Sequence, residues 1–195
     1  HMSKTTIPTG GLADDAVNLT SKVTGTLPVA NGGTALTSGF TNGFTGHMSQ
    51  WRITADFSDD GNPITSNWEL ADTDGYGSLG SNMTQSSGVF TFPATGIYFI
   101  QFITSHTADN IDGLLQIQVE TTTDGTNFGG ASEQMCGISR ASDANTFVTS
   151  FVFDVTNVST HKCRFVVASV SSDTTTHGHS SQNETHATFI KLGDT

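Results

Sequence analysis

Hydrophobic and polar residues alternate over much of the chain after residue 50. In the stretch 51–57, Trp51, Ile53, Ala55 and Phe57 are separated by polar or charged residues. An alternation of period two places every second side chain on one face, and therefore predicts a half-buried β-strand. Similar stretches, bounded by short Gly-, Asn-, Asp- or Ser-rich turns, predict further strands at 64–70, 89–92, 96–104, 114–121, 134–139, 146–155, 162–170 and 187–192.

These predicted strands follow one another with no amphipathic helix between them, so the parallel crossovers of an α/β fold have no helices to use. The composition agrees, since the chain has 21 glycines and is rich in Thr and Ser, which are poor helix formers. Eleven of the 13 Phe residues follow residue 50, and each buried aromatic side chain removes roughly 150–250 Å² from water. We therefore predict an all-β fold, an antiparallel jelly-roll sandwich whose core these Phe side chains fill.

A different pattern precedes these strands. Between residues 3 and 46, single apolar residues are separated by Gly, Thr and Asn, and no period of two or 3.6 persists long enough to bury a face. Two interpretations are open for this segment: a flexible leader, or an extended shaft or linker whose apolar residues are covered by other chains. We divide the chain into residues 1–2, which look like an expression scar, the segment 3–46, and a head domain over 47–195.

The charge of the chain argues against two classes of partner. The net charge is −11 at pH 7, and residues 1–49 are neutral overall, so the whole charge lies in the head. A domain this acidic has few groups that neutralise phosphates, and we expect neither nucleic acid nor an anionic membrane surface as a partner. No run approaches the roughly 18 apolar residues of a membrane-spanning helix, so we expect no membrane insertion.

Two segments before residue 46 carry a resemblance. Residues 11–17 read Gly-Leu-Ala-Asp-Asp-Ala-Val, and residues 25–34 read Gly-Thr-Leu-Pro-Val-Ala-Asn-Gly-Gly-Thr. They resemble elements that recur in bacteriophage tail-fibre and other virion appendage proteins, with Ala35 in place of the usual final Gly. The resemblance implies a slender shaft, commonly of three chains wound together, that leads to a globular tip and connects it to other virion proteins.

The stretch Gly88–Phe102 carries a second resemblance, which concerns the head. It is similar to the signature of the complement component 1q globular head, a relative of tumour necrosis factor. The matching positions, counted from Gly88, are Phe90, Pro93, Gly96, Tyr98 and Phe102. Ile100 stands where that family has Phe, and Met83 stands where an aromatic residue is common. Over roughly residues 50–192 the resemblance implies a complement 1q/tumour necrosis factor-like jelly roll that forms a compact homotrimer.

Together the two resemblances imply a virion structural protein, a tail fibre or appendage tip on the bacteriophage particle surface, assembled in the bacterial host cytoplasm. Its expected role is attachment to a host cell-surface glycan or protein through three equivalent tips, which multiply a weak contact. We expect Tyr98 and Phe189 at the trimer interface. The expected receptor contacts lie in distal loops, at Asp59, Asp60, Asp109 and Asp112.

Two other functions stay open. A complement-like secreted lectin or cytokine-like recognition module would share the head, but we would expect a signal peptide, a disulfide or a collagen-like stalk with it, and residues 3–46 show none of these. A glycan depolymerase would need an acid–base carboxylate pair in a cleft. We expect no catalysis, because no G-x-S-x-G nucleophile elbow is present and no parallel sheet is predicted to carry one.

The sequence His177-Gly178-His179 is a candidate metal site. In an extended segment, residues two apart point to the same side, and neutral imidazole is a good ligand for iron, nickel or zinc. The motif resembles the His-x-His pair through which trimeric bacteriophage tips hold iron, and three copies around an axis would supply six nitrogens. The other interpretation is that both histidines are solvated loop residues. The turn Asp72–Gly75 likewise has two interpretations, solvated turn acids or a weak calcium site.

The chain has two cysteines, Cys136 and Cys163. The resemblance places them on strands separated by a third strand, about twice 4.8 Å apart. This exceeds the separation of about 7 Å between Cα atoms that a disulfide spans. We therefore predict two reduced, buried thiols, which are compatible with assembly in a bacterial cytoplasm.

Overall fold

The structure is a computed structural model of the chain and describes residues 46–195. The predicted shaft or linker at 3–46 and the two residues before it lie outside the described residues, apart from Gly46. The described part forms eleven strands and no helix. The strands are β1 (Met48–Ile53), β2 (Trp68–Leu70), β3 (Thr84–Ser86), β4 (Val89–Thr91), β5 (Gly96–Ala108), β6 (Asp112–Thr122), β7 (Gly129–Ile138), β8 (Asp143–Val155), β9 (Lys162–Ala168), β10 (Thr174–Thr176) and β11 (His186–Gly193).

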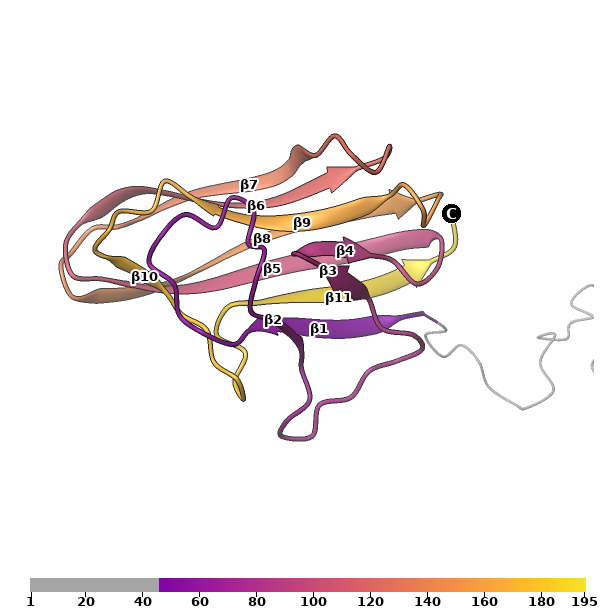
Figure 1. Cartoon of the computed structure of the whole chain (residues 1–195), viewed down its shortest axis with the longest axis horizontal. Helices are drawn as coiled ribbons and strands as arrows, with labels where there is room; N and C mark the ends of the chain where they lie inside the picture. The colour runs from indigo at the N-terminus through magenta and orange to yellow at the C-terminus, as the bar shows by residue number, and fades with distance from the viewer. Residues whose placement is uncertain (1–45) are drawn as a thin grey trace, which may run out of the picture. The chain divides into compact units, whose positions relative to one another are not determined.

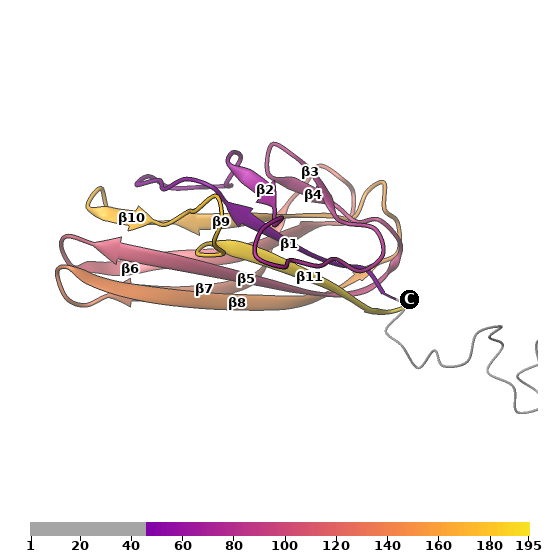
Figure 2. The same ribbon diagram turned by 90° about the horizontal axis from the view of Figure 1, so that it is seen from below.

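The strands pair in two antiparallel sheets, and the long strands β5 to β9 run along the domain (Figure 1). In the first sheet the order is β2–β1–β11–β5, and β8 pairs with the other edge of β5. The short strand β10 pairs with the end of β5, where Thr174 is opposite Ala108, beyond the stretch that pairs with β11. The second sheet has the order β3–β4–β9–β6–β7. Figure 2 shows β11 and β1 beside β5. The predicted antiparallel jelly-roll sandwich is confirmed.

Each predicted strand has a counterpart, but two short strands were not predicted. β3 and β10 consist only of Thr, Gln and Ser, so they carry no hydrophobic alternation for a sequence pattern to detect. β1 also ends at Ile53 rather than near residue 57, because its pairing with β2 stops at Ile53. The predicted strand 64–70 is reduced to β2, which follows Asn67, a residue with a positive φ of 62°.

The core between the two sheets is a cluster of aromatic rings. Phe90 and Phe165 lie at its centre, with ring centroids 5.4 Å apart. The Phe102 ring lies tilted against Phe165 at 4.8 Å, Phe189 lies 5.1 Å from Phe90, and Trp68 approaches Phe90 edge-on at 5.1 Å. Such pairs contribute about 0.5–1.5 kcal/mol each beyond the burial of their area. These rings are the packing residues that the sequence predicted.

Two further predictions are answered by the topology. Cys136 on β7 and Cys163 on β9 are separated by β6, and both are free thiols. Cys163 is buried as predicted, whereas Cys136 is only half-buried. Among residues 46–195 there is no helix of the length and hydropathy that a membrane crossing would require.

Candidate functional site

The outward face of the first sheet carries an apolar strip. Along β5 the even-numbered residues face the core, and the odd-numbered ones, Phe99 among them, face outward and are half-buried. Residues opposite each other in a ladder share a face, and Phe99 is flanked by Val152 of β8 and Ile190 of β11. Ile103 is opposite Val148 in the same way. We call Phe99, Ile103, Val148, Val152 and Ile190 the apolar face.

The apolar face is exposed in a single chain. Val148 and Val152 expose 48% and 54% of their surface. They lie on β8, which pairs only with β5 among the described strands and is therefore an edge strand. Edge strands and contiguous apolar patches are typical contact surfaces between protein chains.

The residues predicted for the trimer interface lie on the opposite side of the same strands. Tyr98 and Phe189 are 0% and 1% exposed within one chain. Tyr98 packs on Phe92 with ring centroids 4.7 Å apart and donates a hydrogen bond to the Ala94 carbonyl at 3.0 Å. The expectation that these two side chains contact another subunit is therefore wrong, because the register turns them into the core. Their neighbours in sequence, Phe99 and Ile190, face outward instead.

Beyond the apolar face, the outward face of the sheet becomes polar and includes a buried arginine. Arg52 of β1 is opposite His186 of β11 and is only 1% exposed. Its Nε donates to Glu69 at 3.2 Å, its Nη1 to Thr73 Oγ1 at 3.1 Å, and its Nη2 to Asp72 at 2.5 Å. Asp72 belongs to the turn for which the sequence leaves a weak calcium site open. In the structure, its carboxylate is a partner of Arg52.

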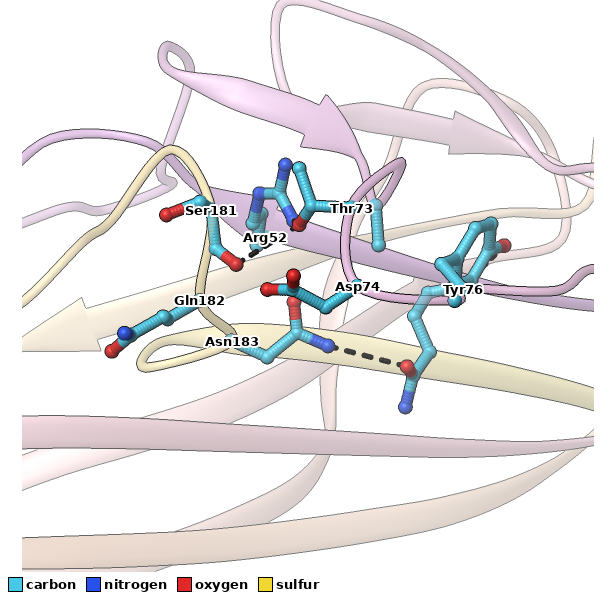
Figure 3. A pocket seen from close by; sticks show the side chains of 10 residues that line it. Arg52, Thr73, Asp74, Tyr76, Ser181, Gln182 and Asn183 are labelled. Atoms are coloured by element: carbon cyan, nitrogen blue, oxygen red, sulfur yellow. Dashed lines mark hydrogen bonds between the residues drawn. The ribbon is translucent and has the colours of Figure 1, made fainter.

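A polar pocket of about 400 Å³ opens beside Arg52. Figure 3 shows the side chains around it. They are Gln50, Arg52, Ala71, Thr73, Asp74, Gly75, Tyr76, Ser181, Gln182 and Asn183. Hydrogen bonds connect the walls: Asn183 donates to the Gln50 side-chain carbonyl at 3.2 Å, and Thr73 donates to the Ser181 carbonyl at 2.9 Å. The Tyr76 hydroxyl accepts a hydrogen bond from the backbone amide of Gln50 at 3.2 Å.

The groups that line the pocket are chemically suited to a ligand rich in hydroxyl groups. Its amide, carboxylate and phenol groups supply both donors and acceptors, and Tyr76 adds an aromatic surface beside them. No sequence pattern indicates this pocket. Its walls come from β1, the loop after β2 and the loop before β11, and no local motif connects these three segments.

A second cluster of polar groups surrounds His177, which follows β10. The His177 Nε2 lies 2.8 Å from Thr107 Oγ1, and its Nδ1 lies 3.3 Å from an Asp56 carboxylate oxygen. The other Asp56 oxygen accepts from the Gly178 amide at 2.9 Å. One ligand atom each of Asp56, His177 and Glu184 lie within 4.8 Å of one another.

His179 is not part of this group. Its amide donates to the Ile53 carbonyl at 2.8 Å, and its Nδ1 accepts from the Ser181 amide at 3.1 Å. Within one chain the structure therefore brings His177 together with two carboxylates, whereas the predicted partner, His179, has other contacts. The arrangement of three chains around an axis stays a prediction.

The four acids predicted for receptor contact have different environments. Asp59 and Asp109 are exposed, and exposed Asp60 accepts from the Val170 amide at 2.8 Å. Asp112 is 4% exposed and accepts from the Ser171 amide at 3.0 Å and from Thr174 Oγ1 at 2.7 Å. Burial by itself would raise the pKa of Asp112, but these hydrogen bonds outweigh it and lower the pKa. The prediction that Asp112 contacts a receptor is wrong, because its carboxylate is enclosed by its own chain.

No protein-family model matches the chain, and no curated protein sequence matches it. Among solved structures, Eiger TNF from S. frugiperda is similar at 12% identity, over 77% of this chain and 95% of that chain, with a TM-score of 0.54. Murine APRIL at pH 5.0 is similar at 15% identity, over 75% of this chain and 99% of that chain, with a TM-score of 0.52. These likenesses show a tumour necrosis factor-like jelly-roll fold, as the sequence predicted. Neither of these two structures is of a bacteriophage protein, so they give no support to the resemblance between residues 11–34 and virion appendage proteins.

Proposed function

We propose that this protein is a non-catalytic binding module that assembles as a homotrimer through its apolar face and attaches to a ligand on a cell surface. The observation that carries the proposal is the apolar face itself. Val148 and Val152 are about half exposed on an edge strand, next to half-buried Phe99, Ile103 and Ile190. A second chain that covers these side chains removes their apolar surface from water, which is the main driving force for association.

Three copies are proposed because the sequence resembles complement 1q and tumour necrosis factor heads over roughly residues 50–192, and that resemblance implies a homotrimer. Closed three-fold symmetry repeats one head-to-tail interface around the ring and leaves no open end. Three pockets on one particle would then act together, and their effective concentration would multiply a weak contact with each ligand. The ligand class that fits the amide, carboxylate and phenol groups of the pocket is a cell-surface glycan.

The place of action that we propose is the surface of a bacteriophage particle, with assembly in the bacterial host cytoplasm. This part of the proposal is supported by the sequence of residues 11–34, which resembles virion appendage proteins. That segment would connect the head to other virion proteins. Of the two other functions considered, the fold likeness to Eiger and APRIL favours a cytokine-like or complement-like recognition module.

Light scattering coupled to size-exclusion chromatography tests the assembly. We expect the full chain to elute with three times its 20.5 kDa mass over a wide concentration range. A single-chain mass throughout would overturn the trimer and with it the multivalent mechanism. Binding to whole bacterial cells and to a glycan array then separates an attachment protein, which binds cells and glycans, from a cytokine-like module, which binds neither.

A further inference from the structure

We propose that Asp56, His177 and Glu184 of one chain bind a divalent first-row transition metal ion. The three residues come from different parts of the chain: Asp56 follows β1, His177 follows β10, and Glu184 precedes β11. One ligand atom of each lies within 4.8 Å of the other two. This site is distinct from the polar pocket and needs no second chain.

The spacing of the donor atoms suits a metal ion. Metal–nitrogen and metal–oxygen distances near 2.0–2.2 Å place neighbouring ligand atoms about 3–3.5 Å apart. The His177 Nδ1 and the Asp56 oxygen are already 3.3 Å apart. Glu184 is the third donor, and a small side-chain rotation would bring its carboxylate from within 4.8 Å to the ligand distance.

The contacts behind the donors orient them as ligands. When Nδ1 of His177 holds the metal, Nε2 carries the proton and donates to Thr107 Oγ1, which lies 2.8 Å away. The Gly178 amide occupies one Asp56 oxygen at 2.9 Å, so the other oxygen stays free to face the ion. Hydrogen bonds of this kind fix the tautomer of a metal-bound histidine and the direction of a metal-bound carboxylate.

The donor set selects the class of ion. An imidazole nitrogen together with two carboxylates suits Zn²⁺, Mn²⁺, Fe²⁺ or Ni²⁺, whereas Ca²⁺ and Mg²⁺ prefer oxygen ligands alone. Three protein ligands leave at least one coordination position open. Asp56 is exposed and the other two residues are half-buried, so water or a ligand group has access to that position.

Metal binding would also affect the polar pocket. The segment between His177 and Glu184 includes Ser181, Gln182 and Asn183, which form one wall of the pocket. An ion held at both ends of this segment and by Asp56 restricts its movement. We therefore expect the metal to stabilise the pocket wall and to raise the affinity of the pocket for its ligand.

Isothermal titration calorimetry tests the site. The full chain is first stripped of metal with EDTA and is then titrated with Zn²⁺ and, separately, with Ni²⁺. We expect one ion per chain, and we expect Asp56→Asn and Glu184→Gln each to weaken binding at least tenfold. Asp59→Asn is the matched control, because Asp59 is an exposed loop acid close in sequence to Asp56 and outside the cluster. His1 is present in every variant and cancels in the comparison.

Glu184→Gln changes a half-buried carboxylate to an isosteric amide, so the variant keeps its fold, and an unchanged melting temperature without metal checks this. Affinity that is unchanged in both variants would overturn the proposal. One ion per three chains, lost on His179→Gln but retained in Glu184→Gln, would also overturn it, in favour of an axial site built by His177 and His179.

Discussion

The guanidinium group of Arg52 lies 2.5 Å from the carboxylate of Asp72 and is almost fully enclosed, although β1 directs it to the outward face of its sheet. The loop that follows β2 covers it, and Glu69 and Thr73 take its remaining hydrogen bonds. This covered charge connects β1 to the loop that forms the polar pocket. A buried charge is tolerated only where partners of this kind replace water.

Replacement of Arg52 by Ala should therefore destabilise the domain by about 3 kcal/mol, because it leaves a cavity in place of an enclosed side chain and removes its three hydrogen bonds. Asp72→Asn should cost less, about 1 kcal/mol or below, since the Asp72 side chain is 62% exposed. Urea denaturation measures the free energy of unfolding of both variants. Asp59→Asn serves as the control and should change stability by less than about 0.5 kcal/mol. Equal losses for Arg52→Ala and Asp72→Asn would contradict the assigned roles.

A charged side chain introduced into the apolar face should prevent the chains from assembling. Val152→Glu places a carboxylate among Phe99, Val148 and Ile190, where a neighbouring chain would have to desolvate it. We expect the variant to elute as single chains in light scattering while its circular dichroism stays unchanged. Met135→Glu is the matched control, because Met135 is also 54% exposed but lies on β7 of the other sheet. A trimeric Val152→Glu protein would show that another surface holds the chains together.

The two thiols should react slowly in the native state. Burial, together with the negative charge of Asp112, raises the pKa of Cys136 to about 11. Burial alone raises the pKa of Cys163, which is 0% exposed. Because the thiolate is the reactive form, titration with Ellman's reagent at pH 7.5 should give slow native reaction and two thiols per chain in denaturant. Fewer than two thiols after unfolding would indicate a disulfide and contradict the separation of β7 and β9.

Stability should fall between pH 6.5 and pH 4 because of His106. This residue is fully buried, with Thr104 and Thr176 as hydrogen-bond partners. Its pKa is lowered to about 4, mainly by burial and also by the nearby His177, while Asp112 acts in the opposite direction. In the unfolded chain the histidine has a pKa near 6.5, so between pH 7 and pH 5 it binds a proton that the folded chain does not bind. The free energy of unfolding therefore decreases by about 2 kcal/mol over this range.

Urea denaturation of metal-free protein at pH 7 and pH 5 checks this. In His106→Gln the side-chain amide can replace both hydrogen bonds but does not titrate. The loss of stability between pH 7 and pH 5 should therefore be smaller in this variant by about 2 kcal/mol. His186, whose pKa burial also lowers, is retained in both proteins and accounts for part of the remaining slope. An unchanged pH dependence in His106→Gln would contradict the assignment.

Gly178 should not accept a side chain. A Cβ at this position would lie 2.6 Å from the Ala55 carbonyl oxygen and 2.7 Å from a methyl group of Ile53. We expect Gly178→Ala to destabilise the domain by about 1–3 kcal/mol and to weaken metal binding, because the segment has to move away from Asp56. Gly77→Ala is the control, since nothing lies within 4 Å of its Cβ position. Thermal melts and metal titration of both variants provide the measurement.

Much of the fold was predictable because it depends on local patterns. The alternation in β1, β5 and β8 and the stretch Gly88–Phe102 were enough to predict an antiparallel jelly roll. Sequence patterns failed where the side chains carry no alternation, as in β10, whose three Thr residues are ordered by pairing with the end of β5. They also failed for the direction of Tyr98 and Phe189, because a family resemblance aligns strands but leaves open which face of a strand meets another chain.

The candidate sites were less predictable. His177 was recognised as a potential ligand, but its partner Asp56 is 121 residues away, and the neighbour in the motif, His179, has other contacts. No sequence pattern indicated that Arg52 is buried, because a single arginine in a strand is usually exposed.

The sequence by itself determined the strands other than β3 and β10, and it determined that they pack around aromatic rings. Strand alternation is a pattern of residues close together in the chain, and the hydrophobic burial follows from the number of aromatic residues. Only the tertiary structure decided which side of β5 stays exposed, that Arg52 is enclosed, and that Asp56, His177 and Glu184 meet. These relationships depend on the register between strands, where a shift of one residue would turn every side chain to the other face.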